Sequence, residues 1–178
     1  DARGSVLLLM PVAVLIMLEL WPGARPLYSA AVSPIYDRIS ADPRRVSVLA
    51  LPFGVRDGTW ETGNFRPRTQ YTQTRHGKTL IGGYLSRISP RRIEKMRRDY
   101  PTLDALIAIS EPGPLSPVAF SLLQARGDRL IEQGHIGYVV IDSRFVPADR
   151  AQMVIDAFRL RLLERDDYLA LYEPERSP

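Results

Sequence analysis

The feature that most limits how this chain can fold is the apolar run from Val6 to Trp21. It reads VLLLMPVAVLIMLELW, and Glu19 is its only charged residue. A helix of this composition has no polar side to present to water. At 1.5 Å per residue it is roughly 24 Å long, close to the ~30 Å hydrocarbon thickness of a bilayer. The run therefore predicts a transmembrane helix, with Trp21 at the membrane interface and Pro22-Gly23 ending it.

Two other interpretations of this run stay open. Arg3 followed by the small residues Ser29-Ala30-Ala31 loosely matches a cleaved signal peptide, although the spacing to that cleavage site is long. A buried core helix is the third possibility. Because the chain begins with Asp1 and not with methionine, we expect it to be a piece of a longer protein. The predicted organisation is a transmembrane-type helix with its flank over 1–25 and a soluble α/β domain over 26–178.

The composition beyond this run is that of an ordinary globular domain. Hydrophobic residues make up 45% of the 178 residues and charged residues 25%, which disfavours wholesale disorder. The absence of cysteine excludes disulfides, thiolate zinc sites and a cysteine nucleophile. With only two histidines, an all-histidine metal site is excluded as well. We predict no metal and no cofactor.

Short apolar strands alternate with amphipathic helices along the chain, which predicts an α/β fold with a mixed, partly parallel sheet flanked by helices. The run 136–142 is the clearest strand, and its near-continuous apolar character indicates burial on both faces. In the helix expected over 117–133, the predicted buried side is Val118, Leu122, Ala125, Leu130 and Ile131. The remaining expected elements are strands at 46–51, 79–81 and 168–172, helices at 33–40, 65–75, 90–100 and 147–164, and a loop at 53–63. The run 102–109 fits a strand or a helix, and its capping residue and alanines favour the helix.

The formal net charge is +4 and the isoelectric point is near 9.6. Most basic residues are spread among acidic ones, and only Arg91-Arg92 with Lys95, Arg97 and Arg98 form a dense cluster. Such a cluster on one helix is typical of a solvated face, with binding to nucleic acid or lipid headgroups as the alternative. We predict no nucleic-acid partner.

Polar residues and paired glycines are concentrated between Tyr71 and Arg87, which we call the central run. His76 is its best candidate for chemistry, since histidine titrates near neutral pH and Asp57 or Glu61 could orient it as a general base. The alternative is that His76 caps the end of the preceding helix.

Other residues of the central run could form a binding surface. Lys78 and Arg87 could hold a phosphate or carboxylate beside Gly82-Gly83, whose backbone allows a close approach. Tyr71 and Gln73, with Tyr84, suit either a pocket or a buried polar network. No Walker loop, dinucleotide fingerprint or GxSxG elbow is present, so these motifs name no reaction.

Several stretches together resemble a known group of proteins. They are the terminal apolar helix, Pro26-Leu27-Tyr28, the strand and turn 48–53, the run 71–78, and Gly82-Gly83-Tyr84 with Ser86-Arg87. With the strands at 138–140 and 168–172, they resemble the carboxy-terminal part of bacterial multi-pass membrane proteins of the glycosyltransferase-C superfamily, which includes mannosyltransferase-like proteins. Only the central run is specific.

This resemblance implies an accessory, extracytoplasmic domain that is not catalytic by itself. It implies three partners: a lipid bilayer, the membrane body of a larger polypeptide, and a lipid-linked sugar. In such transferases the acidic catalytic residue lies in an early loop that this chain does not contain, so no catalytic residue is assigned. Two alternatives stay open, a small hydrolase or transferase that uses His76 with an acidic partner, and a structural interaction module.

Overall fold

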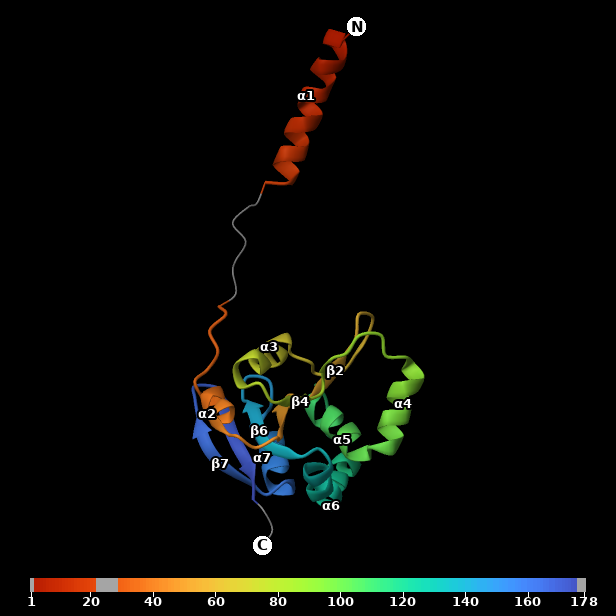
Figure 1. Ribbon diagram of the computed structural model, residues 1–178. Helices are drawn as coiled ribbons and strands as arrows, with labels where there is room; N and C mark the ends of the chain where they lie inside the picture. Colours follow the sequence, from red (N-terminus) through yellow and green to blue (C-terminus); the bar gives the residue numbers. More distant parts are fainter. Residues whose placement is uncertain (1, 22–28, 176–178) are drawn as a thin grey trace. The chain divides into compact units, whose positions relative to one another are not determined.

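The computed structural model describes residues 2–21 and 29–175, with side chains from residue 10 onward, and its elements are shown in Figure 1. The chain divides into two compact units, Asp1–Ala31 and Val32–Pro178. The expected stop at Pro22-Gly23 and the Pro26-Leu27-Tyr28 connection lie outside the described residues.

The first unit contains the helix α1, Ala2–Glu19. The expectation of a helix is confirmed, but none of the helices within residues 2–21 and 29–175 is long and apolar enough to cross a membrane. Its 18 residues give a length of roughly 27 Å, and Arg3 and Ser5 at one end with Glu19 at the other shorten the apolar part further. The prediction of a transmembrane-type helix is therefore corrected to a shorter apolar helix.

The second unit is built on a five-stranded sheet with the strand order β4-β1-β6-β8-β7. The first three strands run parallel, and β8 and β7 are antiparallel to their neighbours. The prediction of a mixed, partly parallel sheet flanked by helices is confirmed. The strands are β1 Ser47–Leu51, β4 Thr79–Ile81, β6 Ile136–Asp142, β7 Leu160–Arg165 and β8 Leu169–Pro174.

A second, three-stranded sheet has the order β3-β2-β5 and occupies a region that we predicted to be a loop. β2 pairs antiparallel with β3 and parallel with β5. The loop prediction for 53–63 was wrong because these strands are short and contain glycine and charged residues instead of an apolar pattern. They are β2 Gly54–Arg56, β3 Glu61–Gly63 and β5 Gly83–Tyr84.

Proline sets the start of four helices, since its fixed φ suits the first turn and its missing N–H is not needed there. The expected helices are confirmed to within a few residues, except the one over 147–164. The helices of this unit are α2 Ile35–Ala41, α3 Pro67–His76, α4 Pro90–Asp99, α5 Pro101–Ser110, α6 Pro117–Gln133 and α7 Ala148–Ala157.

The expected helix over 147–164 ends early. α7 stops at Ala157, Arg159 takes a positive φ of 48°, and the chain continues as β7. Leucines and charged residues fit a helical pattern over this stretch, but pairing of Leu160 to Arg165 with β8 decides for a strand. In so short a segment, pairing with a neighbouring strand outweighs the intrinsic helix propensity of the residues.

The helix α6 also packs by a different face from the predicted one. Val118 is 67% exposed, whereas Ala119, Leu123, Gly127 and Leu130 are buried. The buried face of α6 is therefore shifted by one residue from the predicted one. It includes small residues because α6 lies close to the backbone of α7. Of the five residues predicted to be buried, only Leu130 is fully so.

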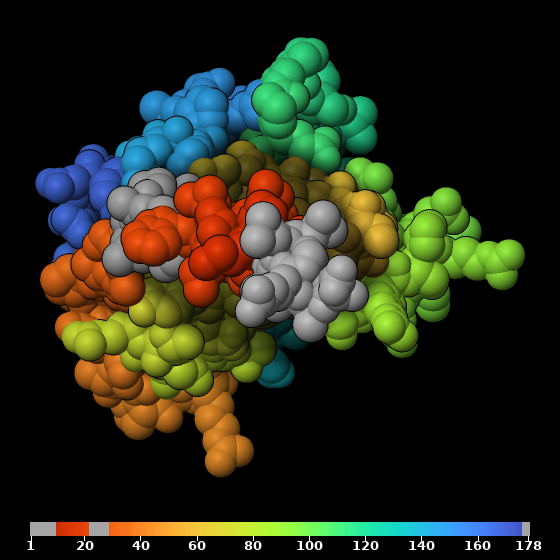
Figure 2. Space-filling view, turned by 90° about the horizontal axis from the view of Figure 1, so that it is seen from above, coloured from red at the N-terminus to blue at the C-terminus, as the bar shows by residue number. Residues whose placement is uncertain are grey.

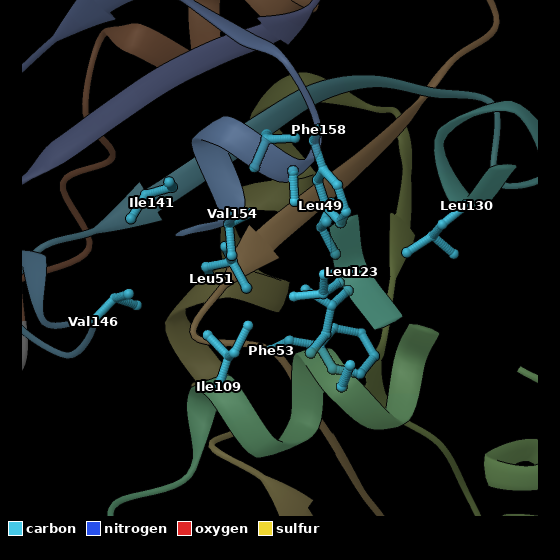
Figure 3. Packing of buried hydrophobic residues seen from close by; sticks show 14 of the residues in the cluster. Leu49, Leu51, Phe53, Ile109, Leu123, Leu130, Ile141, Val146, Val154 and Phe158 are labelled. Carbon is cyan, nitrogen blue, oxygen red and sulfur yellow. The ribbon is translucent and has the colours of Figure 1, made fainter. Parts of the chain in front are cut away.

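Two apolar clusters cover the two faces of the large sheet. Successive residues of a strand point to opposite faces, so Leu49 and Val139 join one cluster while Val48 and Val140 join the other. The larger cluster packs against α5, α6 and α7 and is shown in Figure 3. The smaller one packs against α2. Burial of β1 over its whole length follows from this double cover.

The helix α4 lies at the edge of this unit. In Figure 2 the light-green residues of this region project from one side of the domain. Ile93 is its only fully buried residue, and Met96 is partly buried against the larger cluster. Most of the surface of α4 is therefore in contact with solvent.

Candidate functional site

The central run begins in α3 and ends in the loop after β5. α3 stops at His76, and Gly77 follows with a left-handed φ of 66°, its N–H donating to Gln73 O at 2.8 Å. β4 then joins the edge of the large sheet beside β1, and β5 joins β2. The run therefore connects the two sheets of the domain.

His76 is buried, with only 3% of its surface exposed. Its ring stacks on Tyr36 of α2 at 5.8 Å between centroids and 19° between planes. Its Nδ1 accepts a hydrogen bond from the backbone N–H of Lys78 at 3.1 Å, and its Nε2 has no hydrogen-bond partner among the described residues. Burial, helped by the charge of Lys78, lowers the pKa of His76 to about 4. The imidazole is therefore neutral at neutral pH and enclosed by its own domain.

Asp57 is the first of the two carboxylates expected to orient His76. Its Oδ1 accepts hydrogen bonds from the backbone N–H groups of Thr59 at 2.7 Å and Trp60 at 3.0 Å, and from the Thr59 hydroxyl at 3.0 Å. Its Oδ2 accepts from the N–H of Ile88 at 3.3 Å. The Thr59 N–H first, and then these other donors, hold the pKa of Asp57 below its usual range. This ionised side chain closes the β2–β3 turn and ties it to the loop before α4.

Glu61 also has partners other than His76. Its Oε1 accepts from the N–H of Phe65 at 2.9 Å, and its Oε2 lies 3.7 Å from Arg56. The structure thus gives the proposed base and both of its proposed acidic partners separate roles. The arrangement that an acid–base pair requires, a carboxylate bonded to the histidine, is not formed by His76.

Lys78 and Gln73 hold backbone atoms and not a ligand. The Lys78 ammonium donates to the carbonyl oxygens of Asp42 and Arg44, the latter at 2.8 Å, in the segment that leads from α2 into β1. The Gln73 amide donates to the carbonyl of Lys78 at 3.0 Å. Arg87 is exposed and has a positive φ of 54°. The anion site proposed from Lys78 and Arg87 is therefore not assembled around the lysine.

The glycine pair meets the protein's own backbone and side chains. Gly82 has φ 89°, and a Cβ built there would lie 2.8 Å from the Phe53 ring and 2.9 Å from the carbonyl oxygen of Gly54. Gly83 is buried, also with a positive φ, and pairs with Val55 of β2. The close approach that we expected at these glycines is made by Phe53 and β2.

Tyr71 and Tyr84 are the two tyrosines of the central run, and both are exposed, at 47% and 46%. They line a shallow hollow of about 330 Å³ together with Arg56, Phe65, Pro67 and Gln70. Sequence reasoning missed the last four of these. The available signal was the spacing of Pro67, Gln70 and Tyr71, which places them on one face of α3.

The carboxyl ends of β1 and β6 are the usual ligand position of an open α/β sheet. Here side chains of the domain stack over the segment that follows β6. The Arg66 guanidinium lies 3.7 Å from the centroid of Phe145, and that of Arg144 lies 3.5 Å from the centroid of Tyr168. Arg144 also pairs with Asp142 at 2.6 Å. These stacked groups lie in and beside the segment that follows the carboxyl end of β6.

A hollow of about 770 Å³ lies at the opposite ends of these strands and was not anticipated. Its charged lining is mixed: Arg161 pairs with Glu173, and the pair formed by Asp128 and Arg159 borders it. His135 lies at its edge with a positive φ of 48°. Because both acidic and basic side chains line this hollow, its charge does not favour one class of ligand.

Comparisons with known proteins give no match, whether the chain is compared with protein-family models, curated proteins or solved structures. Within residues 2–21 and 29–175, no group of three or more histidine or acidic side chains is placed to hold a metal ion. Interpretation of the site therefore rests on its geometry.

Proposed function

We propose that this chain is an accessory domain of a larger, membrane-embedded protein of the glycosyltransferase-like type. In this proposal the central run is a structural joint between the two sheets, and the chemistry takes place in the membrane body. The domain lies on the extracytoplasmic side, beside a membrane body that handles a lipid-linked sugar. The sequence resemblance suggests this setting, and the geometry of the central run is what supports the accessory role.

The observation that carries the proposal is the state of His76 and its neighbours. A general base needs access to a substrate and a pKa near the working pH. His76 is 3% exposed with a pKa of about 4, and Asp57 and Lys78 are bonded to backbone atoms. The polar groups that looked like a reaction site are used to hold α2, α3 and the strands β1, β2 and β4 together.

The apolar surface of α1 supports a larger assembly. From Met10 to Trp21 the large apolar side chains are 48–75% exposed within the described part of the chain. Their positions are spread around the helix and not gathered on one side. Exposed apolar surface of this extent marks a contact with lipid or with another protein. We assign it to contact with the lipid and the helices of the membrane body, without a full crossing of the bilayer by α1.

This assignment is tested by changing Leu15 and Leu18, both 68% exposed and one helical turn apart, to glutamate in the full chain. Wild-type chain produced in bacterial cells is expected to sediment with the membranes. Leu15→Glu with Leu18→Glu is expected to move most of the protein into the supernatant, because two charges must leave water to enter an apolar contact. Quantitative blotting of the two fractions measures the shift.

The matched control places the same two charges on exposed positions of the second unit, with Val118→Glu and Leu162→Glu, which are 67% and 48% exposed. These changes are expected to leave the chain with the membranes. A wild-type chain found in the supernatant, or an equal response of both double variants, would contradict the proposal. So would turnover of simple ester, phosphate or glycoside substrates by the purified chain that is lost on His76→Phe.

A further inference from the structure

The positive charge of the chain is concentrated in one short segment. Residues 87–99 contain six basic and two acidic residues, a surplus of four. The formal net charge of the whole chain is also +4, so the remaining residues balance to zero. The excess charge therefore lies entirely in α4 and in Arg87 just before it.

Three of the basic residues lie on the outer side of α4, with the exposed Glu94 among them. Arg91, Lys95 and Arg98 are four and three positions apart, so they lie along one face of the helix. All three are exposed, and Ile93 on the opposite face is buried. Packing through Ile93 therefore turns the basic stripe away from the domain.

Most of this charge is not neutralised by the protein itself. Lys95 pairs with Asp99 and Arg97 with Asp104, both at exposed positions. Within residues 2–21 and 29–175, Arg91, Arg92 and Arg98 make no ion pair. Surface charges that have no structural role are available to a partner of opposite sign.

Exposed apolar and amphipathic residues precede and follow α4 in the sequence. Tyr84 and Leu85 precede α4 and are 46% and 44% exposed, and Tyr100 follows it at 50%. Tyrosine is enriched at the interface between membrane and water, where the ring meets acyl chains and the hydroxyl meets headgroups. A basic helix with such residues before and after it in the sequence is suited to an anionic membrane surface.

We propose that the stripe of Arg91, Lys95 and Arg98 docks α4 onto an anionic phospholipid surface. Arginine binds phosphate oxygens with two N–H groups at once, and lysine adds a point charge. The flanking tyrosines and Leu85 favour lipid over nucleic acid, because duplex binding gains little from exposed aliphatic groups beside a basic face. The inference rests on the membrane association proposed above for its setting, but it concerns a different surface.

The test measures partition of the full chain onto vesicles of phosphatidylglycerol mixed with phosphatidylcholine, and onto phosphatidylcholine alone. The ratio of the two partition coefficients reports the anionic contribution, since α1 contributes to both. Near an anionic surface each basic residue contributes roughly a fivefold gain in partition. Arg91→Ala with Arg98→Ala should therefore lower the ratio about 25-fold, and molar salt should abolish it by screening.

Two controls make the result specific. Arg126→Ala with Arg129→Ala removes the same charge from exposed positions of α6 and should change the ratio less than about threefold. Arg91→Lys with Arg98→Lys keeps the charge and should keep most of the ratio. Equal losses in the α4 and α6 variants, or a wild-type ratio near one, would overturn the proposal. Release from vesicles by a short DNA duplex would overturn it in favour of nucleic acid.

The outcome is separable from that of the proposed function. If α1 does not hold the chain at a membrane, partition onto phosphatidylcholine alone fails while the anionic contribution can persist. If α4 has no role, the ratio falls to one while the chain still binds through α1. Each proposal therefore has its own readout.

Discussion

Lys78 lies in the central run and Lys95 in α4, and the two lysines show how differently these polar regions use their charges. The ammonium of Lys78 donates to two backbone carbonyls, of Asp42 and Arg44, and fixes the entrance to β1. Lys95 is 68% exposed and forms an ion pair with Asp99 within its own helix. The first lysine holds the fold together, whereas the second charges its surface.

The difference extends to the neighbours of both lysines. In the central run, Gln73 and His76 bind backbone groups of Lys78, and Asp57 collects donors from two segments. In α4, by contrast, Arg91 and Arg98 point away from the only buried residue, Ile93. A high density of polar residues therefore does not by itself mark a site. The partners of each polar atom decide whether it is part of the structure or available to a ligand.

The largest effect should come from Gly82 compared with Gly77, since both have a positive φ but only Gly82 is crowded. Gly77→Ala should lower the free energy of unfolding by about 1 kcal/mol, because alanine disfavours the left-handed backbone conformation and nothing crowds its Cβ. Gly82→Ala also drives a Cβ against the Phe53 ring and the Gly54 carbonyl, so its loss should be about 3 kcal/mol or more. Urea unfolding of both variants measures the two losses. Equal losses would show that the joint around Gly82 is loosely packed.

The second effect is a pH dependence that His76 should produce. Its pKa is about 4 in the folded state and ~6.5 when unfolded, so the unfolded chain binds the extra proton between these values. The contribution to stability is complete above about pH 6.5, falls as the pH drops towards 4, and is constant below that. At about 1.4 kcal/mol per pKa unit, the total is about 3 kcal/mol. Urea unfolding at a series of pH values between these limits measures the slope.

His76→Phe keeps a ring to stack on Tyr36 and has no proton to bind, so it should remove this part of the slope. It also loses the acceptor for the N–H of Lys78, which lowers stability at every pH by about 1 kcal/mol. His135→Asn removes the other histidine, which is exposed and has a φ that asparagine tolerates. If His135→Asn flattened the profile and His76→Phe did not, the buried, neutral state of His76 would be refuted.

The sequence was sufficient to predict four strands of the large sheet and its mixed, partly parallel character, but not the strand order, β7 or the smaller sheet. β1 and β6 are continuous apolar runs, and buried parallel strands require that composition. β2 and β3 have only three residues each, with Gly54, Arg56 and Glu61 among them, and no periodic signal can identify such strands. Leu160 to Arg165 fits a helix equally well, and only its pairing with β8 makes it a strand.

The candidate site was found but its role could not be read from residue types. His76 was predicted to be a general base or a helix cap, whereas in the structure its ring stacks on Tyr36, forty residues earlier. Contacts of this separation depend on how α2 packs on α3, which the sequence pattern does not specify. The basic cluster of α4 was visible in the sequence. Its outward direction depends on Ile93 being the buried residue.

The smallest effects should come from the two lysines themselves, which test the comparison directly. Lys78→Met keeps most of the aliphatic chain but leaves the Asp42 and Arg44 carbonyls without their charged donor, a loss of about 1–2 kcal/mol. Lys95→Met removes only an exposed pair within a helix, so its effect on stability should stay within about 0.5 kcal/mol. Urea unfolding measures both.

Binding should respond in the opposite order, because a charge that has a structural role in the fold is not free to meet a lipid phosphate. On vesicles containing phosphatidylglycerol, Lys95→Met should weaken partition about fivefold, and Lys78→Met should leave it nearly unchanged. Removal of one positive charge is thus expected to lower stability at Lys78 and to weaken lipid binding at Lys95. If either substitution changed stability and vesicle binding equally, the central run and α4 would not have separate roles.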